Sequence, residues 1–201
     1  MNPYIEGELR FGTANAYGLE LMMKKESGRL TGWISYTLSK VRKKTNEING
    51  NLPYPPFNDR LHSLALCIQY EASKYWVLSA NWIYASGAAI STPTGFYNYQ
   101  GYQVPIYSSK NNDRLPAYHR MDVSAMLRLN PNHKGRFEHA MIFSVYNVYN
   151  RVNPISITFN KTKLDDQSLV VPMNALSNAS LVPTALALAG FIPSFNYTLK
   201  F

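Results

Sequence analysis

Apolar and polar side chains alternate through most of this chain, with a period of two residues. The alternation is clearest from residue 190 to residue 201, where Phe195, Tyr197, Leu199 and Phe201 are separated by polar residues. A period of two is typical of a β-strand with one apolar face. The same pattern recurs, and it predicts further strands at residues 17–24, 30–39, 63–71, 76–84, 120–129 and 136–159.

The connections between these strands alternate between short and long. The short ones are predicted turns at residues 26–28, 72–74 and 130–135, and the long ones are predicted loops at 45–59, 86–116 and 161–188. Outer-membrane β-barrels alternate in this way, with short turns on the periplasmic side and long loops outside. Residues 1–13 have no clear period and are also interpreted as a loop. We therefore predict an all-β fold, an antiparallel transmembrane β-barrel segment.

The same alternation predicts which side chains face lipid. In the third and fourth strands these are the even-numbered residues, and in the fifth and seventh strands they are the odd-numbered ones. In the sixth strand the alternation slips between residues 146 and 154, where asparagines cluster, and a β-bulge would explain the slip. Seven strands cannot close an antiparallel barrel, because the first and the seventh would be parallel. We therefore expect residues 1–201 to be the C-terminal portion of a larger barrel.

The composition fits this prediction. Hydrophobic residues make up 46% of the chain, yet no run approaches the roughly 18 to 20 apolar residues of a membrane helix. The 15 tyrosines, 9 phenylalanines and 3 tryptophans would supply the aromatic girdles of a barrel. The first residues show neither the basic start nor the apolar core of a signal peptide, so we expect the chain to be part of a longer exported protein. Cys67 is the only cysteine, which excludes a disulfide within the chain.

The formal net charge is +8, and the densest basic run is residues 42–44. The charges are scattered at strand ends rather than gathered on a helix, so we expect no nucleic-acid partner. The basic run has two open interpretations: a solvated strand end or loop, and a contact with lipid phosphates at the membrane face.

Several segments resemble the C-terminal barrel strands of TonB-dependent receptors, most nearly those of Bacteroidetes. They are GWISYTLSK at 32–40, NDRLH at 58–62, LPAYHRMD at 115–122, YNVYNR at 146–151 and PSFNYTLKF at 193–201. Together they span nearly the whole chain. The last segment is similar to the signal that the barrel-assembly machinery reads, which in this chain would comprise Phe195, Tyr197, Leu199 and Phe201.

The resemblance implies a 22-stranded barrel with an N-terminal plug inside it. Such receptors import siderophores, cobalamin or glycans with energy that reaches the plug through TonB. The sequence contains neither the plug nor the TonB box, so the resemblance implies one part of an outer-membrane transporter. The partners it implies are outer-membrane lipids and lipopolysaccharide, the barrel-assembly machinery, the remainder of the receptor including its plug, TonB through that plug, and a surface lipoprotein.

The predicted loop at 86–116 carries the candidate binding residues, which are Phe96, Tyr97, Tyr99, Tyr102 and Tyr107 among several amides. Aromatic rings beside amides suit stacking on a sugar or capping a bulky ligand. A loop that packs on itself or on a partner lipoprotein would have the same composition. The residue types do not separate these two interpretations.

Catalytic chemistry is not indicated. His62 and His119 lie beside arginines and near aspartates, and His139 stands five residues before Ser144. Neither spacing matches a nucleophile, base and orienting residue. No phosphate-binding glycine loop and no spaced metal ligands occur, so we expect no enzyme activity and no cofactor. The alternatives to a receptor are a passive porin or another outer-membrane barrel, and a soluble β-rich binding module.

Overall fold

A computed structural model describes residues 9–100, 102–132, 137–161, 181–187 and 189–200. Seven strands form one antiparallel sheet in the order β1-β2-β3-β4-β9-β10-β13. They are β1 (Gly12–Lys25), β2 (Leu30–Thr45), β3 (His62–Glu71), β4 (Trp76–Ala85), β9 (Tyr118–Arg128), β10 (Glu138–Tyr146) and β13 (Ile192–Lys200). The predictions of an all-β fold and of seven main strands are therefore confirmed. β1 and β13 each pair with a single neighbour, so the sheet is open in the part of the chain described.

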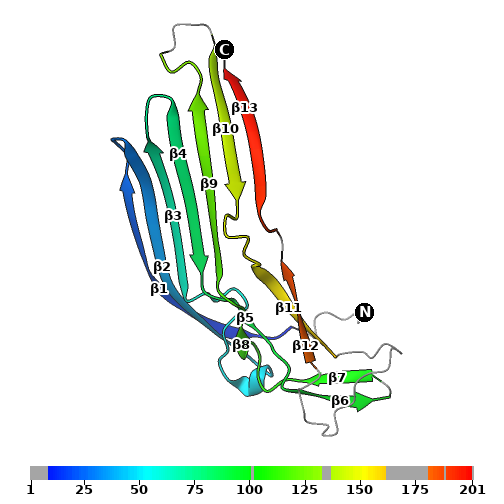
Figure 1. Ribbon diagram of the computed structural model, residues 1–201. Coiled ribbons are helices and arrows are strands. Elements are labelled where there is room, and N and C mark those ends of the chain that lie inside the picture. Colours follow the sequence, from blue (N-terminus) through cyan, green and yellow to red (C-terminus); the bar gives the residue numbers. More distant parts are fainter. Residues whose placement is uncertain (1–8, 101, 133–136, 162–180, 188, 201) are drawn as a thin grey trace, which may run out of the picture.

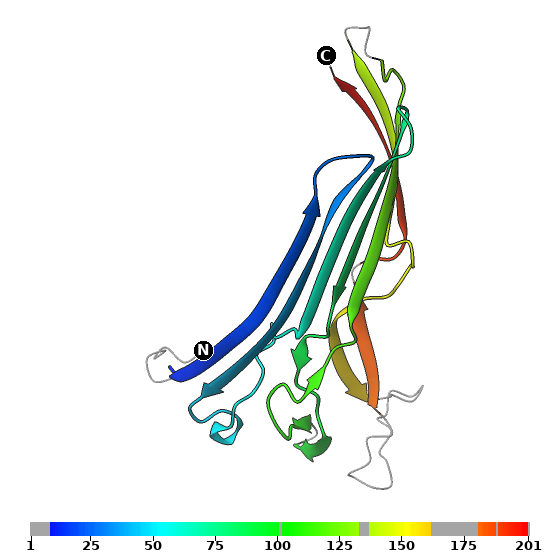
Figure 2. The same ribbon diagram turned by 90° about the vertical axis from the view of Figure 1, so that its left-hand side faces the viewer.

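The sheet is a single curved layer (Figures 1 and 2). The turns that join β1 to β2 and β3 to β4 lie at one end of it, together with the C-terminal end of β13. The longer connections and their small strands lie at the opposite end. We call these the turn end and the loop end. This separation by length is the one that the alternation of short and long connections predicts.

The strand register brings the apolar side chains of all seven strands to one face. Directly opposed residues of an antiparallel pair lie on the same face. Leu66 of β3 is opposed by Ile34 of β2 and by Trp82 of β4, and Phe143 of β10 is opposed by Phe195 of β13. The predicted even and odd sets therefore share one face.

We call it the apolar face. Its main members are Tyr17, Leu19, Leu21 and Met23 on β1, Leu30, Ile34, Tyr36 and Leu38 on β2, Leu64, Leu66, Ile68 and Tyr70 on β3, Trp76, Leu78, Ala80, Trp82 and Tyr84 on β4, Met121, Val123, Ala125 and Leu127 on β9, Met141, Phe143 and Val145 on β10, and Phe195, Tyr197 and Leu199 on β13. The opposite, polar face carries a row of hydroxyl and amide side chains that crosses five strands: Gln69, Ser79, Ser124, Ser144 and Ser194.

No described residue forms a second layer over the apolar face. Leu19, Leu78 and Phe195 are 54%, 43% and 56% exposed. The buried hydrophobic residues among those described are few: Tyr54, Val77, Ala88, Ala89 and Leu115. All of them except Val77, which lies on β4, belong to the connections at the loop end. The sheet is therefore held by its backbone hydrogen bonds and cross-strand contacts rather than by a packed core. Among the described residues, no helix has the length and apolarity that crossing a membrane requires.

Several predicted boundaries differ from the structure. β1 begins at Gly12, inside the predicted N-terminal loop, and β2 continues to Thr45, six residues past its predicted end. The extra residues of β2 pair with β1. The loop at 45–59 contains a 3-10 turn, η2 (Asn49–Asn51).

The predicted loop at 86–116 contains four short strands. β5 (Ala89–Ile90) pairs with β8 (Asp113–Arg114), and β6 (Gly95–Tyr99) pairs with β7 (Tyr102–Ile106). Glycine, proline and asparagine hide these short pairings from a periodicity analysis. The predicted turn at 130–135 lies partly outside the described residues.

The prediction of one continuous sixth strand from 136 to 159 is wrong. β10 ends at Tyr146, and a turn follows before β11 (Pro154–Lys161). β11 leaves the main sheet and pairs with β12 (Leu181–Ala187), which lies inside the predicted loop at 161–188. A turn therefore explains the slip in the alternation, and a shift in the β11–β12 register follows it between Pro154 and Ser156.

Asparagine side chains shape this turn. Asn147 and Asn150 have left-handed backbones, with φ of 53° and 50°, a conformation that asparagine tolerates better than most residues. The Asn147 side chain is fully buried. Its Nδ2 donates to the carbonyls of Arg151 at 3.0 Å and Ala189 at 3.2 Å, and its Oδ1 accepts from the Arg151 amide at 3.2 Å.

Two further asparagines fasten the turn to its neighbours. The Asn150 Oδ1 accepts a hydrogen bond from the Phe191 amide at 2.9 Å. The Asn153 side chain bonds both backbone groups of His119, from the amide at 3.1 Å and to the carbonyl at 3.0 Å. The turn is thereby tied to the segment before β13 and to the start of β9.

We predict that Asn147→Ala lowers the free energy of unfolding by about 3 kcal/mol, because three hydrogen bonds are lost and alanine is strained at a left-handed φ. Asn147→Gly should cost about 1 kcal/mol less, since glycine accepts this φ. Asn98→Ala, at an exposed position of β6, serves as the control and should change stability by less than about 0.5 kcal/mol. Denaturant unfolding of the refolded protein measures all three, and equal stability of the Asn147→Ala and Asn98→Ala variants would contradict the role of this turn.

Candidate functional site

The aromatic candidates of the loop at 86–116 lie on and after the β6–β7 hairpin at the loop end (Figure 1). Tyr97 and Tyr99 are two residues apart on β6, so they share one face of the hairpin, and they are 51% and 59% exposed. Phe96 lies on the other face and is partly buried. The backbone of Tyr102 pairs with Tyr99 across the hairpin. Phe96 therefore faces away from Tyr97 and Tyr99, so these three rings do not converge on one pocket.

Tyr107 belongs to a separate hollow of about 630 Å³ at the loop end. The hollow lies between two connections: η2 with Leu52 on one side, and the segment from Tyr107 to Lys110 on the other. The hollow is open to solvent, and apolar atoms make up most of its lining surface. A neighbouring hollow of about 470 Å³ includes Tyr54, whose ring lies 5.7 Å from the Lys110 ammonium.

A buried carboxylate joins the two long connections. Asp59 is 3% exposed and forms an ion pair with Arg114, which lies 55 residues later in the chain. The Arg114 guanidinium also donates to the carbonyl oxygens of Asp59 at 2.9 Å and Gly87 at 3.0 Å. The second carboxylate oxygen of Asp59 accepts from the Val41 amide at 2.7 Å. We call this the loop junction.

Further hydrogen bonds run parallel to the loop junction. Asn111 donates from Nδ2 to the Pro55 carbonyl at 2.7 Å, and the Lys110 amide donates to Asn49 Oδ1 at 2.9 Å. The buried hydroxyls of Thr45 and Tyr54 lie 2.9 Å apart. The two connections therefore form one ordered surface. This arrangement is not predictable from local sequence patterns, because most of its partners lie far apart in the chain.

The polar face carries an ion pair at the loop end of β9. Arg120 and Asp122 are two residues apart on β9 and share this face, and Arg120 Nη2 lies 2.9 Å from Asp122 Oδ2. Arg120 Nη1 donates to the hydroxyls of Tyr118 at 3.1 Å and Tyr146 at 2.8 Å. The guanidinium also stacks 4.2 Å from the centre of the Tyr146 ring. Both terminal nitrogens of this guanidinium, Nη1 and Nη2, therefore have a partner on β9 or β10.

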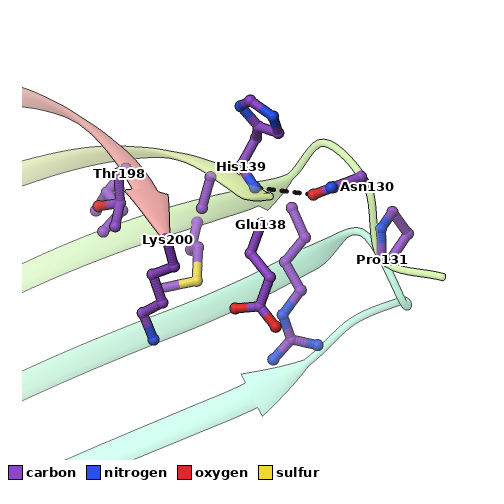
Figure 3. A pocket seen from close by; sticks show the side chains of 10 residues that line it. Asn130, Pro131, Glu138, His139, Thr198 and Lys200 are labelled. Carbon is purple, nitrogen blue, oxygen red and sulfur yellow. Dashed lines mark hydrogen bonds between the residues drawn. The ribbon is translucent and has the colours of Figure 1, made fainter. Parts of the chain in front are cut away.

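A charged hollow lies on the polar face at the turn end (Figure 3). It measures about 450 Å³ and is lined by residues of β9, β10 and β13 with the start of the β9–β10 connection. Glu138 and Lys200 are opposed in the register and lie on one side of the sheet, whereas His139 points to the other side (Figure 3). The hollow therefore brings together acidic and basic groups in the manner of a water-facing strand end.

The terminal strand presents its predicted aromatic set on the apolar face. Phe195 packs against Phe143 with ring centres 5.0 Å apart, and the Tyr197 hydroxyl lies 2.5 Å from His139 Nδ1. Leu199 is opposed by His139 in the register and is 47% exposed. Phe201 lies outside the described residues.

His62, His119 and His139, the described histidines, do not form a nucleophile–base pair with Ser144. The Nδ1 atom of His62 lies 2.9 Å from the Tyr36 hydroxyl, and the ring of His119 meets Tyr149 edge-on. Ser144 lies on the face opposite to His139 and bonds the Ser194 hydroxyl at 2.6 Å. In the ranges that the structure describes, no three His, Cys, Asp or Glu side chains are grouped to hold a metal ion.

Removing the arginine of the loop junction should be more damaging than removing its aspartate. Arg114→Ala leaves a buried carboxylate without its counter-ion, at a cost of about 3–5 kcal/mol. Asp59→Ala leaves an arginine that is 40% exposed and that water can solvate, at a cost of about 1–3 kcal/mol.

Unfolding free energies and hydrogen exchange across residues 46–61 and 102–117 provide the measurement. Lys110→Ala, which removes an exposed cation from the same connection, is the matched control and should shift stability by less than about 1 kcal/mol. A larger cost for Asp59→Ala than for Arg114→Ala would contradict the assigned roles.

Comparison of this chain with models of protein families, with curated proteins and with solved structures found no match. The functional interpretation therefore rests on the residues themselves. Three features carry it: the uncovered apolar face, the polar face behind it, and the ordered surface at the loop end.

Proposed function

We propose that this chain forms part of the wall and the outer loops of a TonB-dependent receptor in the outer membrane. The observation that carries the proposal is the apolar face, which runs without interruption across all seven strands and is not covered by any described residue. In water such a face is unfavourable, since each large apolar side chain gains about 1.5–3 kcal/mol when it is fully buried. A lipid bilayer supplies that burial along the whole face.

The hydrogen-bonding state of the strands supports the same environment. A strand can cross a bilayer only when its backbone groups are paired. The five inner strands of the sheet each have two neighbours, whereas β1 and β13 have one. In the proposed receptor, further strands pair with these two edges and close the barrel. The 22-stranded barrel of the receptor family would provide them.

The separation of short turns from long connections supports an orientation. The turn end faces the periplasm, and the loop end faces the outside of the cell. The polar face then lines the lumen, where the serine row and the charged hollow contact water or the plug. The loop end presents its exposed tyrosines to a ligand or to a surface lipoprotein.

The position of β13 at the edge of the sheet agrees with a role in assembly. Phe195, Tyr197 and Leu199 occupy alternate positions on the apolar face of an edge strand. An edge strand has a free row of backbone groups, which another protein can pair with. We assign these three residues, with Phe201, to recognition by the barrel-assembly machinery.

The membrane wall is tested by arginine substitutions at adjacent residues that face opposite sides. Leu78→Arg and Val123→Arg should each lower the unfolding free energy in a bilayer by about 2–4 kcal/mol, because they place a charge on the apolar face within the membrane. Ser79→Arg and Ser124→Arg, each one position away on the polar face, should cost less than about 1 kcal/mol. The complete receptor refolded into lipid vesicles is the sample.

A soluble module gives a different result. Leu78 is already 43% exposed, so arginine there would be nearly neutral in water. Equal tolerance of Leu78→Arg and Ser79→Arg would reject the membrane wall.

The receptor is separated from a passive barrel by its energy requirement. Uptake through the complete protein should stop in cells that lack TonB, whereas a porin would continue to admit the same solute.

The exposed tyrosines of β6 are tested by ligand binding. Tyr97→Ala and Tyr99→Ala should each weaken binding by about two- to tenfold, because each removes a ring that stacks on the ligand. Asn98→Ala, on the opposite face of the same hairpin, is the control, and an equal loss from all three variants would contradict stacking.

A further inference from the structure

The β1–β2 hairpin extends beyond the rest of the sheet at the loop end. β3 pairs with β2 only as far as Leu38, which is opposed by His62. β2 then continues to Thr45 with β1 as its strand partner, and Figure 2 shows the two strands curving onward as an arm. We call residues 39–45 of β2 and 12–18 of β1 the arm.

The side chains on the apolar face of β2 change character where the arm begins. From Leu30 to Leu38 this face carries apolar residues and Gly32. The next three positions on the same face are Lys40, Arg42 and Lys44. The basic run at residues 42–44 is therefore split between the two faces, because Lys43 lies on the polar face. Lys40, Arg42 and Lys44 lie together on the other face.

The length of the apolar part matches a membrane. Leu30 to Leu38 is nine residues, and a tilted transmembrane β-strand needs about 9–11. The first cation, Lys40, is opposed on β1 by Tyr17, which is 63% exposed. A tyrosine beside a cation is the usual composition at the boundary between hydrocarbon and headgroups.

The three cations are exposed and form no ion pair within the part of the chain described, although Arg42 also lines the hollow of about 470 Å³ that contains Asp113. Lys40, Arg42 and Lys44 are all exposed, and none of them is in an ion pair there. The residues opposed to them on β1 are Tyr17, Asn15 and Thr13, which are uncharged. Successive cations stand about 6.8 Å apart along the strand.

We propose that Lys40, Arg42 and Lys44 form a binding row for the phosphate groups of lipid headgroups, in the leaflet that the loop end faces. The inference rests on the proposed membrane wall and adds a specific lipid contact to it. The apolar part of β2 fixes the depth of the strand, and the row then meets the headgroups directly above the acyl chains. Arginine and lysine both bind phosphate by charge-assisted hydrogen bonds.

The test compares two triple variants of equal net charge. The outward variant is Lys40→Gln with Arg42→Gln and Lys44→Gln. The inward variant is Lys24→Gln with Lys43→Gln and Lys200→Gln, whose cations all lie on the polar face. The complete receptor, with this chain unchanged or carrying either set of substitutions, is refolded with vesicles of phosphatidylcholine alone and with vesicles that also contain phosphatidylglycerol. Co-sedimentation measures binding, and circular dichroism measures the β-structure formed.

Each cation close to an anionic lipid surface strengthens binding by about fivefold at low salt. The outward variant should therefore bind phosphatidylglycerol vesicles about a hundredfold more weakly than the unchanged chain, while the inward variant keeps most of its affinity. Binding to pure phosphatidylcholine, which depends on the apolar face, should be the same for all three.

Two failures are distinguishable. If no form of the chain binds either kind of vesicle, the proposed membrane wall fails, and the lipid row fails with it. If all forms bind both kinds and the two variants lose equal affinity for the anionic vesicles, the wall stands and the lipid row is overturned. The second result would also follow if the row served an acidic protein partner instead of a lipid.

Discussion

The ladder of hydrogen bonds between neighbouring strands is the interaction on which the rest of this structure depends. Most folds stabilise a sheet by packing a second layer against its apolar face. Here the apolar face remains uncovered in the described residues, and only a handful of hydrophobic side chains are buried. The ladder alone therefore fixes the relative positions of the strands. Solvation of the apolar face then decides in which environment the sheet is stable, and the proposed lipid surrounding follows from this requirement.

The loop end obeys a different principle. Its connections contain little regular structure, yet they are ordered by polar contacts between distant segments. The loop junction joins the β2–β3 connection to the segment before β9, and the asparagine turn joins β10 to the segment before β13. In both places a buried polar side chain satisfies backbone groups that no strand partner satisfies. The surface proposed to meet the ligand is thereby supported from two sides.

The part of the fold that follows from local periodicity could be predicted from the sequence. Alternation identifies the main strands and their faces because a strand displays every second side chain on the same side. The predicted strand at 136–159 failed because Ile155 and Ile157 continue the alternation past a turn that asparagines create. Those asparagines were visible in the sequence, but the contact that explains Asn147 reaches Ala189, which is 42 residues away.

The candidate site could be predicted less well than the fold. Aromatic composition located the loop at 86–116, but the pairing of β6 with β7 places Phe96 on a different face from Tyr97 and Tyr99. The pairing of Asp59 with Arg114 spans 55 residues and leaves no local pattern. Contacts of this kind arise from tertiary structure, so a reading of period and composition does not reveal them.

The shared parity of the strands restricts how the length of this protein can change in evolution. An odd number of residues inserted or deleted within a strand exchanges the two faces of every position beyond the change. In a seven-strand layer whose faces differ so much in composition, one such event would place serines on the apolar face and leucines on the polar face. Length changes inside the strands should therefore come in pairs of residues or be absorbed by a bulge. The connections at the loop end carry no such restriction, and this leaves them free to diversify while the wall stays constant.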